Sequence, residues 1–130
     1  MKIDLGKNEL IHFVGIGGIG MSGLALIMNG LGYKVQGSDI TNNRNIERLS
    51  EKKIKVFIKH KKKNIKKTSM LVISSAIKKN NPEVVGAMRK DLPIYTRGDM
   101  LGHIVSFMRN VVVTGSHGKT TTTSLVASIF

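Results

Sequence analysis

Short apolar runs alternate with stretches of amphipathic spacing along most of this chain. Residues 10–14 (Leu-Ile-His-Phe-Val) and 70–74 (Met-Leu-Val-Ile-Ser) are apolar runs typical of strands buried on both faces of a parallel sheet. Residues 20–29 instead repeat apolar side chains at the three- and four-residue spacing of a helix. The predicted strands cover residues 10–14, 33–37, 54–58, 70–74, 92–95 and 110–114. The predicted helices cover residues 20–29, 45–53, 83–90 and 99–109, and residues 60–67 are predicted to form a loop.

Strands alternating with helices in this way predict an α/β fold, in which helices flank a Rossmann-like parallel sheet. Crossovers in such sheets are right-handed, and ligands bind at the carboxyl ends of the strands. Five strands complete one unit, so we predict a Rossmann-like domain over residues 1–109. Residues 110–130 are then expected to open a second domain with a strand, a phosphate-binding loop and a helix.

The first candidate site is the glycine-rich run Gly15-Ile16-Gly17-Gly18-Ile19-Gly20, which follows a predicted strand and opens a predicted helix. In that context the first glycine permits a tight turn, and the middle glycines let the backbone approach a diphosphate. The last glycine lets the helix pack closely on the strand. The helix N-terminus then presents free N–H groups to the phosphates. The alternative is a glycine-rich turn that binds no ligand.

Asp39 follows the second predicted strand, nineteen positions after Gly20. An acidic residue about 20 positions after the glycine run binds the ribose hydroxyls in dinucleotide-binding folds. Ser38 could share that role. The alternative for Asp39 is a helix cap or a turn residue. This pair of residues does not distinguish the ribose of NAD from the ribose of a uridine nucleotide.

A second candidate site lies in residues 114–123, Thr-Gly-Ser-His-Gly-Lys-Thr-Thr-Thr-Thr. It is a shortened phosphate loop, with two residues between Gly115 and the Gly-Lys pair where the usual motif has four. Lys119 is expected to neutralise the terminal phosphates of ATP, as the candidate catalytic residue, and the Thr120 hydroxyl to bind Mg²⁺. The residues assigned to ATP are Gly115, Ser116, His117, Gly118, Lys119, Thr120 and Thr121.

The net charge is +13, and lysines crowd residues 52–67. Such a charge raises nucleic acid, a membrane surface or an anionic ligand as partners. The lysine-rich segment lacks the aromatic residues on which single-stranded nucleic acids stack, so we expect a solvated basic loop and no nucleic-acid partner. The chain has no cysteine, which excludes disulfides, thiolate metal sites and cysteine nucleophiles.

The N-terminus lacks the apolar core of a signal peptide, and apolar stretches are interrupted well short of a membrane span. We therefore expect a cytoplasmic protein without a membrane partner. The phosphate loop stands close to the last residue, Phe130. We expect the chain to be the front end of a larger enzyme, with the remaining domains as partners, and to be catalytically inactive alone.

Two nucleotide-binding motifs in this order resemble the Mur ligases of peptidoglycan synthesis. The resemblance is carried by Ile11–Gly23, by Gly37-Ser38-Asp39, by Ser74-Ser75-Ala76-Ile77, by Asn81-Pro82-Glu83, by Arg97–Leu101 and by the phosphate loop. It extends over nearly the whole chain. Ser116 stands where the family usually has Thr, and Gly98-Asp99 stand where it usually has Ala-Glu.

The resemblance implies a Rossmann-like domain that binds the UDP of UDP-N-acetylmuramate, followed by a domain that binds ATP and Mg²⁺. It implies that ATP activates the lactyl carboxylate as an acyl phosphate, which the amine of L-alanine attacks. In that family His60 matches a histidine that could contact the uridine. The residues assigned to the UDP-sugar are Gly15, Gly17, Gly18, Ile19, Gly20, Ser38, Asp39, His60, Ser74, Ser75 and Ala76.

Three other interpretations remain open at this point. A related ligase would join a whole peptide to the same sugar nucleotide, although the run from Gly15 to Gly23 favours the branch that adds L-alanine. An NAD-binding oxidoreductase or sensor fits the first motif but leaves the phosphate loop unexplained. A nucleic-acid-binding module fits only the charge.

Overall fold

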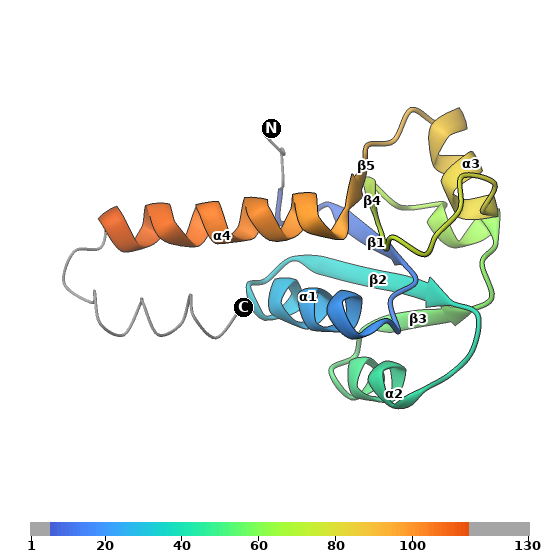
Figure 1. The fold of residues 1–130 in the computed structure, drawn as a ribbon, viewed down its shortest axis with the longest axis horizontal. Coiled ribbons are helices and arrows are strands. Elements are labelled where there is room, and N and C mark those ends of the chain that lie inside the picture. Colours follow the sequence, from blue (N-terminus) through green and yellow to red (C-terminus); the bar gives the residue numbers. More distant parts are fainter. Residues whose placement is uncertain (1–5, 115–130) are drawn as a thin grey trace. The chain divides into compact units, whose positions relative to one another are not determined.

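A five-stranded sheet with helices between its strands forms most of the computed structural model (Figure 1), which describes the backbone of residues 6–114 and the side chains of residues 6–109. The strands are β1 (Leu10–Val14), β2 (Lys34–Asp39), β3 (Lys55–Ile58), β4 (Met70–Ile73) and β5 (Ile94–Thr96). The helices are α1 (Ile19–Gly30), α2 (Arg44–Glu51), the 3₁₀ helix η1 (Lys62–Ile65), α3 (Pro82–Arg89) and α4 (Arg97–Thr114).

All strand pairs are parallel, in the order β3-β2-β1-β4-β5. Since parallel crossovers are right-handed, α1 and α2 cover one face of the sheet, and η1 and α3 cover the other. The order reverses between β1 and β4, so consecutive connections there leave on opposite faces and a crevice opens at the carboxyl ends of these strands. The predicted α/β fold with a Rossmann-like parallel sheet is confirmed.

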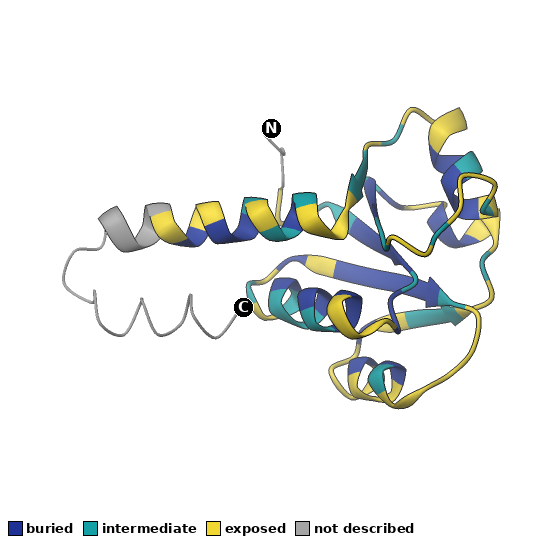
Figure 2. Cartoon of the chain, in the orientation of Figure 1, coloured by how far each residue is buried: buried dark blue, intermediate teal, exposed yellow. Residues whose placement is uncertain are grey.

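The core explains why the central strands are almost wholly apolar. Figure 2 shows β1 and β4 buried along most of their length, as strands covered on both faces should be. On the face under α3, Val14 packs in a cluster with Ile65, Leu71 and Ala87. Asn43 and Asn81 cap α2 and α3, because their side chains accept hydrogen bonds from the first-turn amides of Ile46 and Glu83. These caps fix where both helices begin beside the sheet.

In two segments the structure has a different kind of element from the one that the sequence predicts. Residues 60–67, predicted to form a loop, contain η1. The strand predicted over residues 110–114 is wrong, because α4 continues to Thr114. Three consecutive valines favour a strand, but a strand must pair its backbone with a neighbour, whereas a helix satisfies most of its backbone hydrogen bonds internally. None of the described helices has the length and apolarity to cross a bilayer.

The chain divides into two compact units, of which the first ends at Arg97 and holds the whole sheet. The second includes α4 from Gly98 onward. The domain boundary near residue 109 stays a prediction, since residues 115–130, with the phosphate loop, lie outside the described part of the chain.

Candidate functional site

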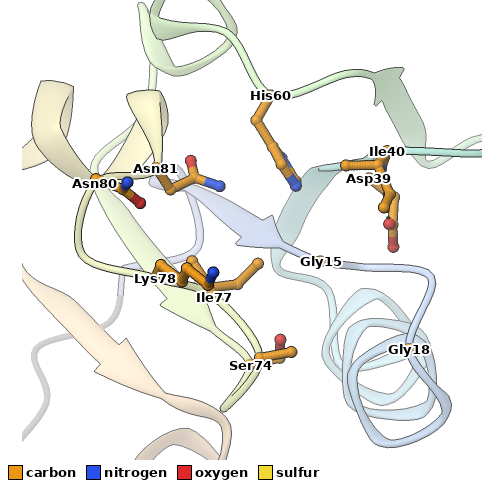
Figure 3. Close-up of a pocket in the computed structure, with 11 residues that line it drawn as sticks. Gly15, Gly18, Asp39, Ile40, His60, Ser74, Ile77, Lys78, Asn80 and Asn81 are labelled. Carbon is orange, nitrogen blue, oxygen red and sulfur yellow. Dashed lines mark hydrogen bonds between the residues drawn. The ribbon is translucent and has the colours of Figure 1, made fainter.

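A pocket of about 410 Å³ lies at the carboxyl ends of the strands, where the strand order reverses (Figure 3). Each of the four strands β1–β4 is followed by residues that line it. The lining residues are Gly15, Gly18, Asp39, Ile40, His60, Ser74, Ala76, Ile77, Lys78, Asn80 and Asn81. This is the position at which open parallel sheets bind their ligands.

The glycine-rich run begins with a turn that the neighbouring strand holds in place. Gly15 has a φ of 83°, a conformation that residues with a side chain rarely adopt. The amides of Gly15 and Ile16 both donate to the carbonyl oxygen of Ser38, at 2.9 and 3.0 Å. A Cβ on Gly15 would lie 3.1 Å from the Ser74 hydroxyl oxygen, so the turn also fits closely against the end of β4.

Asp39 holds the glycine-rich run through its carboxylate. The Gly17 amide donates to Asp39 Oδ2 at 2.7 Å, and the Ile40 amide donates to Oδ1 at 2.8 Å. A Cβ on Gly17 would lie 2.7 Å from Asp39 Oδ2 and 3.0 Å from Asn43 Nδ2. The sequence assigned Gly17 to close approach of a diphosphate, but in this structure its backbone meets Asp39. Asp39 also lines the pocket, so a ribose contact remains compatible with its position.

Behind the pocket lies a buried carboxylate, Glu83, which sequence reasoning missed. Its Oε1 lies 2.8 Å from His12 Nε2 and accepts from the Ser38 hydroxyl at 2.5 Å. Its Oε2 accepts from the Lys61 amide at 3.1 Å and from Asn64 Nδ2 at 2.7 Å. These donors come from β1, β2 and the segment after β3, so one side chain ties together three parts of the chain that meet at the pocket.

The protonation of this cluster follows from its geometry. Gln36 Nε2 lies 2.9 Å from the Asn64 carbonyl oxygen, which can only accept, so this atom is the amide nitrogen. The same nitrogen lies 2.9 Å from His12 Nδ1, which therefore accepts, and the neutral His12 ring donates through Nε2 to Glu83. Burial raises the pKa of Glu83, but the hydrogen bonds that its ionised carboxylate accepts from His12, Ser38 and Asn64 outweigh this effect and hold the pKa below its usual value.

The structure brings six of the residues assigned to the UDP-sugar to the pocket wall: Gly15, Gly18, Asp39, His60, Ser74 and Ala76. Ser38 is fully buried behind the wall, where its hydroxyl binds Glu83 and His60. Gly17, Ile19, Gly20 and Ser75 are not among the lining residues. A Cβ on Gly20 would lie 3.0–3.2 Å from Arg97 side-chain atoms, so Gly20 gives room to that arginine.

The residues assigned to ATP, Gly115–Thr121, lie outside the described residues. Within the described residues, no group of three or more histidine or acidic side chains is arranged to hold a metal ion. The pocket also includes Ile40, Ile77, Lys78, Asn80 and Asn81, which were not assigned from the sequence. The loop after β4 supplies most of these, and the run Ser74–Ile77 with Asn81 had already stood out in the sequence.

The model of the Mur ligase family, catalytic domain, matches residues 10–109. The chain belongs to the Mur ligase family. The UDP-N-acetylmuramate–L-alanine ligase of Pelagibacter ubique is 68% identical over 130 residues, which are 100% of this chain and 28% of that protein. The ligase of the same name from Brucella ovis is 53% identical over 129 residues, which are 99% of this chain and 27% of that protein.

Solved structures of other Mur ligases share the fold. The UDP-N-acetylmuramate–alanine ligase of Thermotoga maritima superposes with a TM-score of 0.68 and is 34% identical, over 77% of this chain and 23% of that one. The UDP-N-acetylmuramate:L-alanyl-γ-D-glutamyl-meso-diaminopimelate ligase of Neisseria meningitidis gives a TM-score of 0.65 at 27% identity, over 68% of this chain and 28% of that one. The chain thus spans about a quarter of the length of these relatives.

Proposed function

We propose that this chain is the N-terminal part of an ATP-dependent ligase that joins L-alanine to UDP-N-acetylmuramate, with the cytoplasm as its compartment. The observation that carries the proposal is the pocket where the strand order reverses, lined by Gly15, Asp39, His60 and Ser74. It is supported by 68% identity to a ligase of that name over the whole chain.

The UDP moiety is the part of the ligand that this pocket suits. Helix α1 begins beside it without a side-chain cap and without an acidic residue in its first turn. Its first amides and the positive end of its dipole are therefore available to a diphosphate. Lys78 adds a positive charge to the wall, while Asp39 and His60 offer polar groups to the nucleoside.

The residues that would hold ATP and Mg²⁺ belong to the same proposal. We assign the phosphates to the loop Gly115–Thr121, with Lys119 neutralising their charge and the Thr120 hydroxyl binding the metal. Bound ATP would supply the phosphoryl group that activates the lactyl carboxylate of the sugar for attack by the amine of L-alanine. No nucleic acid or membrane partner is part of the proposal.

A related ligase that joins a whole peptide to the same sugar nucleotide is the second candidate. The likeness to the Neisseria enzyme, at 27% identity, is the observation that favours it. Offering L-alanine or the tripeptide to the full-length protein, with ATP and UDP-N-acetylmuramate, and measuring phosphate release would decide between them.

Calorimetric titration of this chain with UDP-N-acetylmuramate and, separately, with NAD tests the pocket assignment. We expect heat of binding with the UDP-sugar and none with NAD. Binding of NAD in place of the UDP-sugar would overturn the proposal, because the glycine-rich run would then serve a dinucleotide.

A Gly17→Val variant should lose binding of the UDP-sugar in the same titration. Its Cβ would overlap the Asp39 carboxylate and Asn43, so the glycine-rich run could not keep its present course. Unchanged affinity would count against a role for this run in ligand binding. Gly23→Val is the matched control, since a Cβ on Gly23 meets nothing within 4 Å.

A further inference from the structure

The Ser38 hydroxyl lies between a buried carboxylate and a histidine of the pocket wall. Ser38 Oγ is 2.5 Å from Glu83 Oε1 and 2.8 Å from His60 Nδ1. Glu83 is fully buried, whereas His60 lines the pocket and its ring is directed into it (Figure 3). Two successive hydrogen bonds, one between Glu83 and Ser38 and one between Ser38 and His60, therefore connect the buried carboxylate to the pocket.

The direction of both hydrogen bonds follows from counting donors. The Glu83 carboxylate is ionised and can only accept, and four donors surround it: His12 Nε2, the Ser38 hydroxyl, the Lys61 amide and Asn64 Nδ2. Ser38 has a single hydroxyl proton, which it gives to Glu83. Toward His60 it can then only accept, so the proton of that hydrogen bond belongs to His60 Nδ1.

We propose that Glu83 is a positioning residue of the nucleotide pocket, which through Ser38 holds the neutral His60 ring as its Nδ1–H tautomer. The Nε2 atom, on the opposite edge of the ring, then presents a lone pair to the pocket and accepts a hydrogen bond from the nucleoside of the ligand. The choice of nucleoside ligand rests on the proposed function, whereas the tautomer follows from this chain alone.

The backbone that carries His60 is held by the same carboxylate. Lys59, the residue before it, has a φ of 80°, where residues with a side chain are uncommon and must be held by their surroundings. Its amide donates to the Asp39 carbonyl oxygen at 2.6 Å, and its own carbonyl oxygen accepts from Asn64 Nδ2 at 3.1 Å. Asn64 in turn donates to Glu83, so Glu83 supports both the path of this turn and the tautomer of the ring.

A Glu83→Gln variant should reverse the donor and acceptor roles in two hydrogen bonds, the one between Ser38 and residue 83 and the one between His60 and Ser38. The amide oxygen faces the Lys61 amide and Asn64 Nδ2, which both donate, so the amide NH₂ faces Ser38. It also faces the Nε2–H of His12, which loses its acceptor, so this variant is expected to be less stable than the wild type. Ser38 then accepts from Gln and turns its own proton toward His60 Nδ1. The ring consequently moves its proton to Nε2, and a donor replaces the acceptor that faced the ligand.

The test is nitrogen-15 NMR of the histidines in this chain, at a pH where the rings are neutral, together with titration by UDP and by CDP. In the wild type we expect His60 as the Nδ1–H tautomer, His12 as the Nε2–H tautomer, and a shift of the His60 Nε2 resonance when UDP binds. In Glu83→Gln, His60 should switch to Nε2–H and UDP should bind about tenfold more weakly, the effect of one lost hydrogen bond. Glu51→Gln, at an exposed glutamate, should change neither quantity.

The two nucleotides distinguish the possible donors, because uracil carries an N–H where cytosine carries an acceptor, and their riboses are the same. A preference for UDP that disappears in Glu83→Gln supports the base as donor. Equal affinities that fall together in the variant support a ribose hydroxyl.

The inference is overturned by an Nε2–H tautomer of His60 in the wild type, a result that needs no variant to fold. It is also overturned if folded Glu83→Gln keeps the Nδ1–H tautomer or keeps its affinity after the tautomer has switched. If the wild type binds neither nucleotide, the proposed function fails, while the tautomer measurement still decides the role of Glu83.

Discussion

The free energy of unfolding of a Glu83→Ala variant should be about 4 kcal/mol lower than that of the wild type, because several buried donors lose their acceptor at once. His12 Nε2, the Ser38 hydroxyl, the Lys61 amide and Asn64 Nδ2 all donate to this carboxylate. Alanine offers them no acceptor, and the cavity that it leaves adds to the loss. Urea denaturation followed by circular dichroism at neutral pH measures the change.

The matched control for this variant is Glu51→Ala, which removes an exposed carboxylate at the end of α2 and should have no measurable effect. A loss below about 1 kcal/mol in Glu83→Ala would mean that water replaces the carboxylate at little cost. The hydrogen-bond cluster would then not be what holds β1, β2 and α3 together at the pocket.

The pH dependence of stability gives a second measure of the same carboxylate. The folded pKa of Glu83 lies below the unfolded value of 4.5, so its contribution is fully present above that value. It is lost as the pH falls through the folded pKa, because the protonated acid accepts fewer hydrogen bonds. The stability difference between the wild type and Glu83→Ala should therefore narrow in acid. A constant difference down to acid unfolding would contradict this assignment.

A Gly37→Ala variant should lose about 3 kcal/mol of stability, the upper end of the range for overpacking a core. An added Cβ would lie 2.5 Å from Ile16 Cδ1 and 2.6 Å from the Phe13 carbonyl oxygen. Ile16 can turn its Cδ1 away, but its Cβ, 2.7 Å from the added atom, stays in place. Phe13 offers backbone in the centre of the sheet, where β1 pairs with β2. To make room, β2 must separate from β1 next to the glycine-rich run, so we expect UDP binding to weaken as well.

Gly23→Ala is the control for that variant, since an added Cβ meets nothing within 4 Å and lies in the middle of α1. Alanine is favoured over glycine in a helix by about 0.8–1.0 kcal/mol, so this variant should gain stability. Thermal unfolding of both variants beside the wild type gives the comparison. Equal unfolding temperatures for Gly37→Ala and Gly23→Ala would show that β1 and β2 can separate without loss of stability.

Local sequence patterns predicted the sheet well, because a short apolar run between two helices can form few structures other than a buried parallel strand. The strand predicted at residues 10–14 has the bounds of β1, and His12 is buried within it. The prediction failed at residues 110–114, where three valines suggested a strand and α4 continues instead. Valine favours a β-strand, but a strand forms only where a neighbouring strand is available to pair with it.

Only part of the pocket was predicted, because only some of its residues are related by a spacing that can be recognised in the sequence. Gly15 and Asp39 belong to a spacing that the sequence displays, so both were found. Glu83 belongs to no such spacing, since its partners His12, Ser38 and Asn64 are 71, 45 and 19 positions away. A glutamate after Pro82 resembles an ordinary first-turn residue of a helix. The run Asn81-Pro82-Glu83 was noticed as a family feature, but its chemistry became visible only in the folded chain.

The residues that hold the glycine-rich run in place determine how much of the chain would have to be moved to transfer this pocket to another protein. The run donates hydrogen bonds to the Ser38 carbonyl oxygen and the Asp39 carboxylate. It accepts hydrogen bonds from the side chains of Asn43 and Asn45, so all of these partners come from β2 and the start of α2. A designer who moved only Gly15–Gly20 into another scaffold would move a loop without the groups that shape it. The smallest portable module is therefore Leu10 to Asn45, with both strands in their present register.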